Sequence, residues 1–281
     1  MGAIVGDIIG SRFGRGVRPK PGFELFSAGS RPTGISVMTL ACADAVMAAR
    51  AAFPYPAPMV QMKAGGTSRC EALWSGLPTR ELVAAASWAR KPRRAPGPPE
   101  GTPEVGRISG ADTRSNGDVD GDQRRALLGV LAASCMRALA SGRELPSLGR
   151  RMLEWLRQDG AGPFGSFGSG GAAMVSAAGL AASDRDDASR TAETLCSLTH
   201  HHAEGTRGAR GLAVAICMAR DGKSTCEFRH VIPVNFTRRD FRISDVRSSY
   251  KFDATCSCTV PIAIQCFPQS TSFEEAVRSA A

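Results

Sequence analysis

Residues 33–50 read TGISVMTLACADAVMAAR, and their apolar side chains recur with the period of an α-helix. Thr33 and Ser36 carry hydroxyl groups that can cap the start of such a helix, and the apolar stripe begins at Val37. The helix should end before Pro54, because proline lacks the amide hydrogen that would continue it. This stretch therefore predicts a long helix with one face in the core.

A second helix is predicted at residues 1–12, where Gly2, Gly6 and Gly10 recur at every fourth position between isoleucine and valine. Positions four apart lie on one face of a helix, so these glycines should let another backbone approach closely. We therefore expect this helix to be buried against a neighbour.

Further helical patterns continue through the second half of the chain. The last of them opens at Ser272 with the sequence SFEE, which has the composition of a capping box. No stretch shows strand alternation of comparable strength, so the predicted fold class is all-α. These helices are expected within residues 126–139, 188–195, 209–216 and 272–280.

The composition predicts a single domain over residues 1–281. Hydrophobic residues make up 43% of the chain, which is enough for a core, and an aromatic content of only 6% favours helices over a β-sandwich. Residues 92–123 instead mix Pro, Gly, Asp, Arg and Ser with few apolar side chains. Such a segment cannot offset the entropy lost on ordering, so it is predicted to be a disordered insertion within the domain.

The formal charge of +9 at pH 7 predicts a surface that attracts phosphate groups of a nucleotide, a nucleic acid or a phospholipid. The densest basic run, residues 90–94, has no interleaved aromatic side chains and is typical of a solvated linker. A basic protein that binds nucleic acid remains the alternative, and its binding would depend steeply on salt.

The nine cysteines have irregular spacings and form no CxxC pair, which indicates neither a disulfide framework nor a zinc site. A reducing compartment and a cytoplasmic location are therefore expected. The first apolar run, residues 3–9, contains Asp7, follows no basic segment and is too short to cross a bilayer. We accordingly predict neither a signal peptide nor a membrane segment.

Two polar segments have the residue types of a ligand site. Residues 165–171, GSFGSGG, form a glycine-rich turn whose backbone can approach a phosphate, although they fit neither the P-loop nor the dinucleotide fingerprint. Residues 200–202 are three histidines, of which at most two could share a metal ion if they are helical. The alternative for this cluster is a polar helix terminus.

Taken in order, five groups of residues resemble the ADP-ribosylglycohydrolase family. Residues 166–176, SFGSGGAAMVS, are similar to the family loop S-[FY]-G-N-G-[SG]-A-M-R-V-S, and residues 199–205, THHHAEG, are similar to T-H-N-H-P-E-G. The resemblance implies an all-α orthogonal bundle and hydrolysis of the glycosidic bond between ADP-ribose and a protein or small conjugate with two magnesium ions. The other similar segments are 1–13, 37–45 and 250–253, the last with 260–261 and 270–280.

By this resemblance, Ser166, Phe167 and Gly168 match positions that cradle the distal ribose and the phosphates. His200 matches a histidine that contacts the ligand. We therefore expect Phe167 to stack on the ligand and His200 to donate to a phosphate. The expected partner is ADP-ribose or an ADP-ribosylated protein.

The metal-binding residues depart from the family. Its first metal motif, T-D-D-[TS], aligns with residues 33–36, so that Thr33 remains while Gly34 and Ile35 replace both carboxylates. The second motif, G-G-D-S-D-T, should follow the last predicted helix, and the sequence reaches Ala281 before it. A C-terminal segment that closes the bundle is therefore expected to be missing.

The chemistry of glycoside hydrolysis makes these losses important. The reaction passes through an oxocarbenium-like state that requires an oriented water and a base to activate it. We therefore expect no magnesium or other cofactor in this chain, little or no hydrolysis, and weak binding of ADP-ribose. The alternative is an active hydrolase that recruits Asp7 or Asp253 in place of the missing carboxylates.

Overall fold

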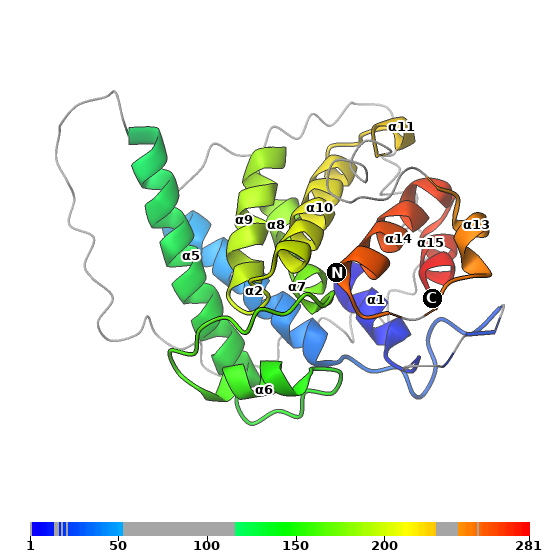
Figure 1. Cartoon of the computed structure of the whole chain (residues 1–281), viewed down its shortest axis with the longest axis horizontal. Coiled ribbons are helices and arrows are strands. Elements are labelled where there is room, and N and C mark those ends of the chain that lie inside the picture. Colours follow the sequence, from blue (N-terminus) through cyan, green and yellow to red (C-terminus); the bar gives the residue numbers. More distant parts are fainter. Residues whose placement is uncertain are drawn as a thin grey trace.

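The computed structural model describes residues 2–13, 17, 19–20, 22–52, 116–228, 241–251 and 253–281. The regular elements in these residues are all helices, which confirms the predicted all-α class (Figure 1). The helices are α1 (Gly2–Gly10), α2 (Gly34–Ala52), α5 (Asn116–Ala140), α6 (Arg150–Arg157), α7 (Gly170–Ala173), α8 (Ser176–Ala181), α9 (Arg185–Ser197), α10 (Ala203–Arg220), α11 (Thr225–Phe228), α13 (Ile243–Arg247), α14 (Cys256–Gln269) and α15 (Phe273–Ala280).

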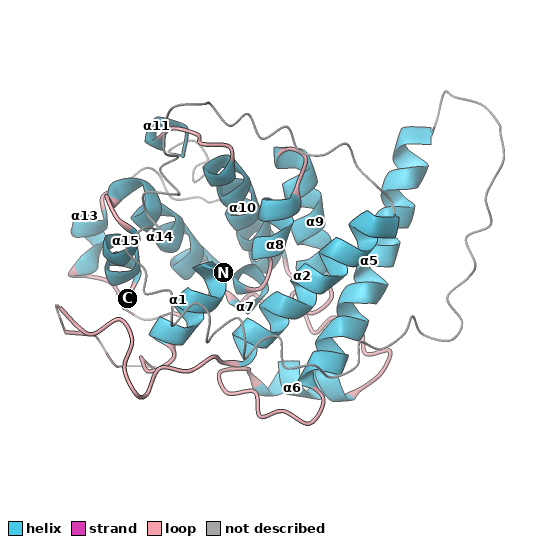
Figure 2. Ribbon diagram, turned by 180° about the vertical axis from the view of Figure 1, so that it is seen from behind, coloured by secondary structure: helices cyan, strands magenta, loops and turns pink. Residues whose placement is uncertain are grey.

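The main core lies among the long helices. Helix α2 packs along α5, and α10 packs along α9 and α8 on one side and against α14 on the other (Figure 2). Small side chains dominate these interfaces: Ala41 and Ala45 of α2 and Ala209 and Ala213 of α10 have no exposed surface. Helices with such small side chains can approach one another closely. The short helices α7 and α8 lie between the long ones and contact both α2 and α10.

Two predicted helices have a recognisable capping residue at one end. Helix α2 is described to Ala52, and Pro54 lies outside the described residues. The first turn of α2 is capped by Thr33, whose Oγ1 accepts a hydrogen bond of 3.1 Å from the amide of Ile35. Helix α10 ends at Arg220, and Gly222 follows it with a φ of +69°. Glycine adopts this left-handed conformation without the strain that a side chain would cause.

The cap of α15 is confirmed, with one difference from a capping box. Ser272 Oγ accepts a hydrogen bond of 3.0 Å from the amide of Glu275, as predicted. The Glu275 carboxylate, however, accepts from the amide and the hydroxyl of Thr271, each at 2.6 Å. The reciprocal half of the cap therefore lies one residue further from the helix than in the standard arrangement.

The predicted close approach at the glycine face of α1 is wrong. A Cβ atom placed on Gly6 or on Gly10 would meet nothing within 4 Å. Helix α1 instead packs through the side chains of Ile4 and Ile8, which contact Leu40 of α2. Glycine spacing shows which side chains are missing from a face, but it does not show whether a neighbour uses the space.

The predicted disordered insertion is wrong at its C-terminal end. Residues 116–123 are helical, because α5 begins at Asn116 and continues without a break to Ala140. Extending an existing helix adds a hydrogen bond for each residue fixed, so a polar segment can join the end of a helix that is held by packing. The rest of the predicted insertion, residues 92–115, and the basic run at 90–94 lie outside the described residues.

One helix in the described part of the chain, α2, is long and apolar enough to cross a membrane by length and composition. No such segment was predicted from the sequence. Half of this apolar stretch is buried against the rest of the structure. That burial follows from its packing against α5, α8 and α1.

Candidate functional site

The glycine-rich loop between α6 and α7 is clamped to the segment that precedes α14. The amide of Ser169 donates to Ala254 O at 2.8 Å, and the amide of Cys256 donates to Phe167 O at 3.0 Å. These bonds form an isolated antiparallel bridge between Gly168 and Thr255. Cys256 Sγ also donates to Gly168 O, a residue 88 positions earlier in the sequence. The loop is therefore held by a distant segment of the chain.

His200 lies behind this loop. A Cβ atom on Gly170 would be 3.2 Å from His200 Nε2, and one on Gly171 would be 2.9 Å from His200 Cβ. Only glycine therefore allows the backbone to pass so close to the imidazole. The resemblance assigned this loop to a ligand, and the structure shows that its glycines also make room for the histidine.

The imidazole of His200 is neutral at neutral pH. Its side chain is 8% exposed, and burial lowers its pKa to about 4. Its Nδ1 is 2.7 Å from Thr199 Oγ1, and its ring centroid is 5.5 Å from that of Phe164. Any contact of His200 with a phosphate would thus use a neutral N–H group and not a positive charge.

Phe167 is the exposed side chain of the loop. Its exposed fraction is 51%, although phenylalanine is usually buried. The ring of His202 lies edge-on to it, with the ring centroids 5.7 Å apart. This pair leaves aromatic surface available for a planar ligand group to stack on.

The other two histidines of the cluster occupy a helix terminus, as the simpler interpretation predicted. His202 is the N-cap of α10, and its Nδ1 accepts a hydrogen bond of 3.2 Å from the amide of Glu204. In the part of the chain that the structure describes, no three His, Cys, Asp or Glu side chains gather as metal ligands would. His202 therefore caps the helix and contacts Phe167.

Two residues near the loop were not singled out from the sequence. The guanidinium of Arg151, on α6, lies 5.2 Å from the centroid of the Phe164 ring, which in turn contacts His200. The Glu204 carboxylate accepts hydrogen bonds from the amide and the hydroxyl of Ser257, at 2.9 and 2.5 Å. Glu204 belongs to the family-like segment 199–205, but no sequence pattern links α6 to the loop.

Thr33, which the resemblance aligns with the first metal motif, is bound to Asp7. Its amide donates to Asp7 Oδ2 at 2.8 Å, and its hydroxyl donates to Asp7 Oδ1 at 2.7 Å. The hydroxyl of Ser36 donates to Asp7 Oδ2 at 2.6 Å. Both oxygens of Asp7 are thus occupied by the first turn of α2, and in this arrangement Asp7 holds a helix terminus.

Gly34 has no room for the carboxylate that the family places there. A Cβ atom on Gly34 would lie 2.4 Å from Leu148 Cγ, and the Gly34 amide donates to Pro146 O at 2.8 Å. The Leu148 side chain therefore fills the space that an aspartate would need. The residues present do not fit a magnesium site at this position.

Asp253, the other carboxylate considered as a replacement, also has a local partner. Its Oδ1 accepts a hydrogen bond of 2.7 Å from the amide of Thr255, and this bond holds the pKa of Asp253 below its usual range. The carboxylate is ionised at neutral pH and supports the turn that enters α14. The ionised form could act as a base or a metal ligand but not as a general acid, and in this structure its Oδ1 is used by the turn.

The structure brings Ser166, Phe167, Gly168 and His200 together at one place, the clamped loop. Ser166 Oγ accepts a hydrogen bond of 3.2 Å from the amide of Gly168, which shapes the loop from within. Thr33 lies at the start of α2, the helix whose Thr39 contacts Ala173 O of α7 at 3.4 Å. Comparisons of the chain with protein-family models, curated proteins and solved structures give no match.

Proposed function

We propose that this chain is a protein of the ADP-ribosylglycohydrolase type that binds ADP-ribose and has lost metal-dependent hydrolysis. The observation that carries the proposal is the clamped loop at residues 165–170 with the exposed ring of Phe167 on it. An adenine or a ribose face can stack on this ring. The backbone beside it is free of bulky side chains, so a diphosphate can approach it.

The loss of hydrolysis rests on the environment of the first metal motif. Asp7 is occupied by Thr33 and Ser36, and Leu148 fills the space beside Gly34. Held by these hydrogen bonds, Asp7 is poorly placed to act as the base that activates a water molecule. The orthogonal arrangement of the family bundle is part of the same proposal, since the helical content alone does not specify it.

We expect the purified protein to release no ADP-ribose from modified arginine or serine, or from O-acetyl-ADP-ribose, above the rate in buffer. Removing one group that stabilises the transition state commonly costs about 3 kcal/mol, or roughly a hundredfold in rate. The assay is chromatography of the released ADP-ribose with and without magnesium. Turnover that requires magnesium would contradict the proposal and favour the active hydrolase that recruits other carboxylates.

We expect ADP-ribose to bind independently of magnesium, and Phe167→Ala to weaken this binding about tenfold, because stacking of a base on an aromatic ring contributes about 1–3 kcal/mol. The measurement is isothermal titration calorimetry. The matched control is Leu180→Ala, which removes an equally exposed apolar side chain, 52% against 51%, from α8. Equal affinity in the two variants would show that Phe167 does not contact the ligand.

A further inference from the structure

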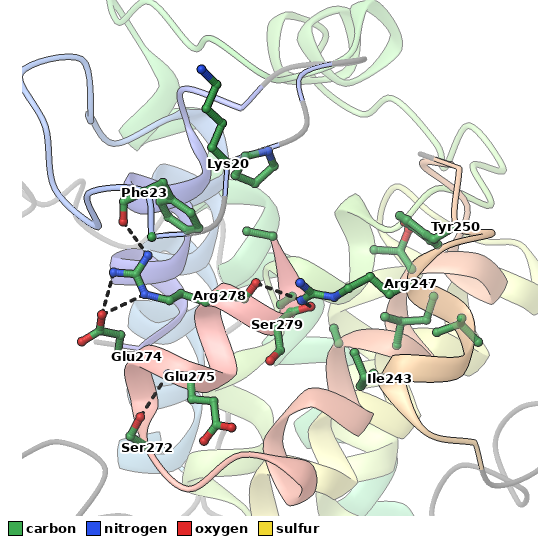
Figure 3. Close-up of a pocket in the computed structure, with 18 residues that line it drawn as sticks. Lys20, Phe23, Ile243, Arg247, Tyr250, Ser272, Glu274, Glu275, Arg278 and Ser279 are labelled. Atoms are coloured by element: carbon green, nitrogen blue, oxygen red, sulfur yellow. Dashed lines mark hydrogen bonds and ion pairs between the residues drawn. The ribbon is translucent and has the colours of Figure 1, made fainter.

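A cavity lies among the C-terminal helices, and its lining includes Thr259, one helical turn after Thr255 of the clamp. It is formed by α13, α14, α15 and the segment around Phe23, and its volume is about 680 Å³ (Figure 3). Pockets that bind small molecules commonly have volumes of about 300–1,000 Å³. The cavity is thus large enough for a ligand of moderate size.

The body of the cavity is apolar. Ile243 and Val246 of α13 line one side, Ile262 and Ala263 of α14 line another, and Phe23 contributes an aromatic ring. Ala263 is exposed to solvent although it lines the cavity, so the space opens to the surface. These side chains suit an apolar ligand body.

Two charged side chains of α15, Arg278 and Glu274, form an ion pair, and the carboxylate of Glu275 accepts hydrogen bonds from Thr271. Arg278 donates to Glu274 Oε1 at 2.6 Å and to the carbonyl of Phe23, and its guanidinium lies 4.8 Å from the centroid of the Phe23 ring. The Glu275 carboxylate is held by Thr271. Figure 3 shows Arg278 extended between Glu274 and Phe23, away from Arg247.

Arg247 has N–H groups for which no hydrogen bond is found among the described residues. Among the described residues, the hydrogen-bond partners of its guanidinium are the carbonyls of Arg278 and Ser279. Both accept from Nη2, at 3.4 and 3.3 Å. The guanidinium extends from α13 toward Ser279 at the edge of the cavity (Figure 3). A guanidinium has five N–H donors in a planar fork that matches a carboxylate or a similar acid group. Lys20, which also lines the cavity, adds a second positive charge.

We propose that this cavity binds a small amphipathic anion, with the apolar body between α13 and α14 and the acid group on Arg247. The carboxylate or sulfonate would accept hydrogen bonds from the nitrogens of Arg247 that have no partner among the described residues. The apolar body would cover Ile243, Val246 and Ile262. This site does not depend on ADP-ribose binding, because it shares no residue with the clamped loop.

The proposal is tested with two fluorescent probes of similar shape on the whole chain. Anilinonaphthalene sulfonate carries the acid group, and phenylnaphthylamine is its neutral counterpart. We expect Arg247→Gln to weaken binding of the sulfonate about tenfold and that of the neutral probe by less than about twofold, since a charge-assisted hydrogen bond favours only the acid. Dodecanoate should displace both probes.

Two further variants make the result specific. Arg242→Gln removes the same charge from the residue before α13, which does not line the cavity, and should leave both affinities unchanged. Ala263→Phe places a ring in the cavity from an exposed position and should weaken both probes. The proposal is overturned if Arg247→Gln and Arg242→Gln bind the sulfonate equally, or if Ala263→Phe binds both probes like the unmodified protein.

Discussion

Gly179→Ala should lower the free energy of unfolding by about 3 kcal/mol, although it adds a single methyl group. A Cβ atom at this position of α8 would lie 2.4 Å from Ala213 O and 2.7 Å from Ile216 Cβ, both on α10. A backbone oxygen inside a helix cannot rotate away as the end of a side chain can. The two helices would therefore have to separate in the middle of the core, which would loosen the packing around them.

The measurement is the midpoint of urea unfolding followed by circular dichroism. Gly129→Ala is the matched control, because Gly129 lies inside α5 and a Cβ atom there would meet only Leu198 Cδ2, at 3.8 Å. That variant should be more stable by up to about 1 kcal/mol, since alanine favours a helix over glycine. The two variants are thus expected to change stability in opposite directions, and a similar change in both would show that α8 and α10 do not approach as closely as described.

Asp7→Ala should also lower the free energy of unfolding by about 3 kcal/mol. It removes the acceptor of the Thr33 amide and hydroxyl and of the Ser36 hydroxyl, and Ser36 has no exposed surface on which water could replace it. Donors that are buried without an acceptor carry the full cost of desolvation. Asp7→Asn keeps one acceptor oxygen and should lose less.

Hydrogen exchange at the Ile35 amide gives a local measurement of the same effect. This amide donates to Thr33 Oγ1, whose position depends on Asp7, so its exchange should accelerate in Asp7→Ala. Asp159→Ala is the control, because the Asp159 side chain is 99% exposed. If the two alanine variants have the same stability and the same exchange at Ile35, Asp7 does not hold the start of α2.

Helices with a strong apolar period could be predicted from the sequence with their ends. In α2, the hydroxyl of Thr33 is a local signal, and it specifies where the helix starts. The glycine spacing of α1 predicted a close helix contact that does not form, because no neighbour among the described residues lies beside Gly6 or Gly10. Close approaches of this kind occur at other glycines, among them Gly179 of α8 and Gly208 of α10.

The sequence predicted which residues of the candidate site lie near one another, but only part of what each residue contacts. The family-like segments place Phe167 and His200 in the same loop region, as the structure does. The surroundings of His200, however, include Phe164 and the glycines Gly170 and Gly171 of α7, which are distant from it in sequence. The link between Asp7 and Thr33 spans 26 residues and joins two segments that no sequence pattern connects.

The packing of Leu148 against Gly34 also limits how this sequence can change. An aspartate at residue 34 can arise from some glycine codons by one nucleotide change, but its Cβ atom would collide with Leu148 while that leucine is present. A smaller residue at 148 alone would leave a cavity beside α2, which also costs stability. Either first step therefore produces a less stable protein, and the two substitutions are acceptable only together. The packing at this point therefore opposes gradual change: while Leu148 fills the space beside Gly34, no single substitution introduces a carboxylate at residue 34 without a loss of stability.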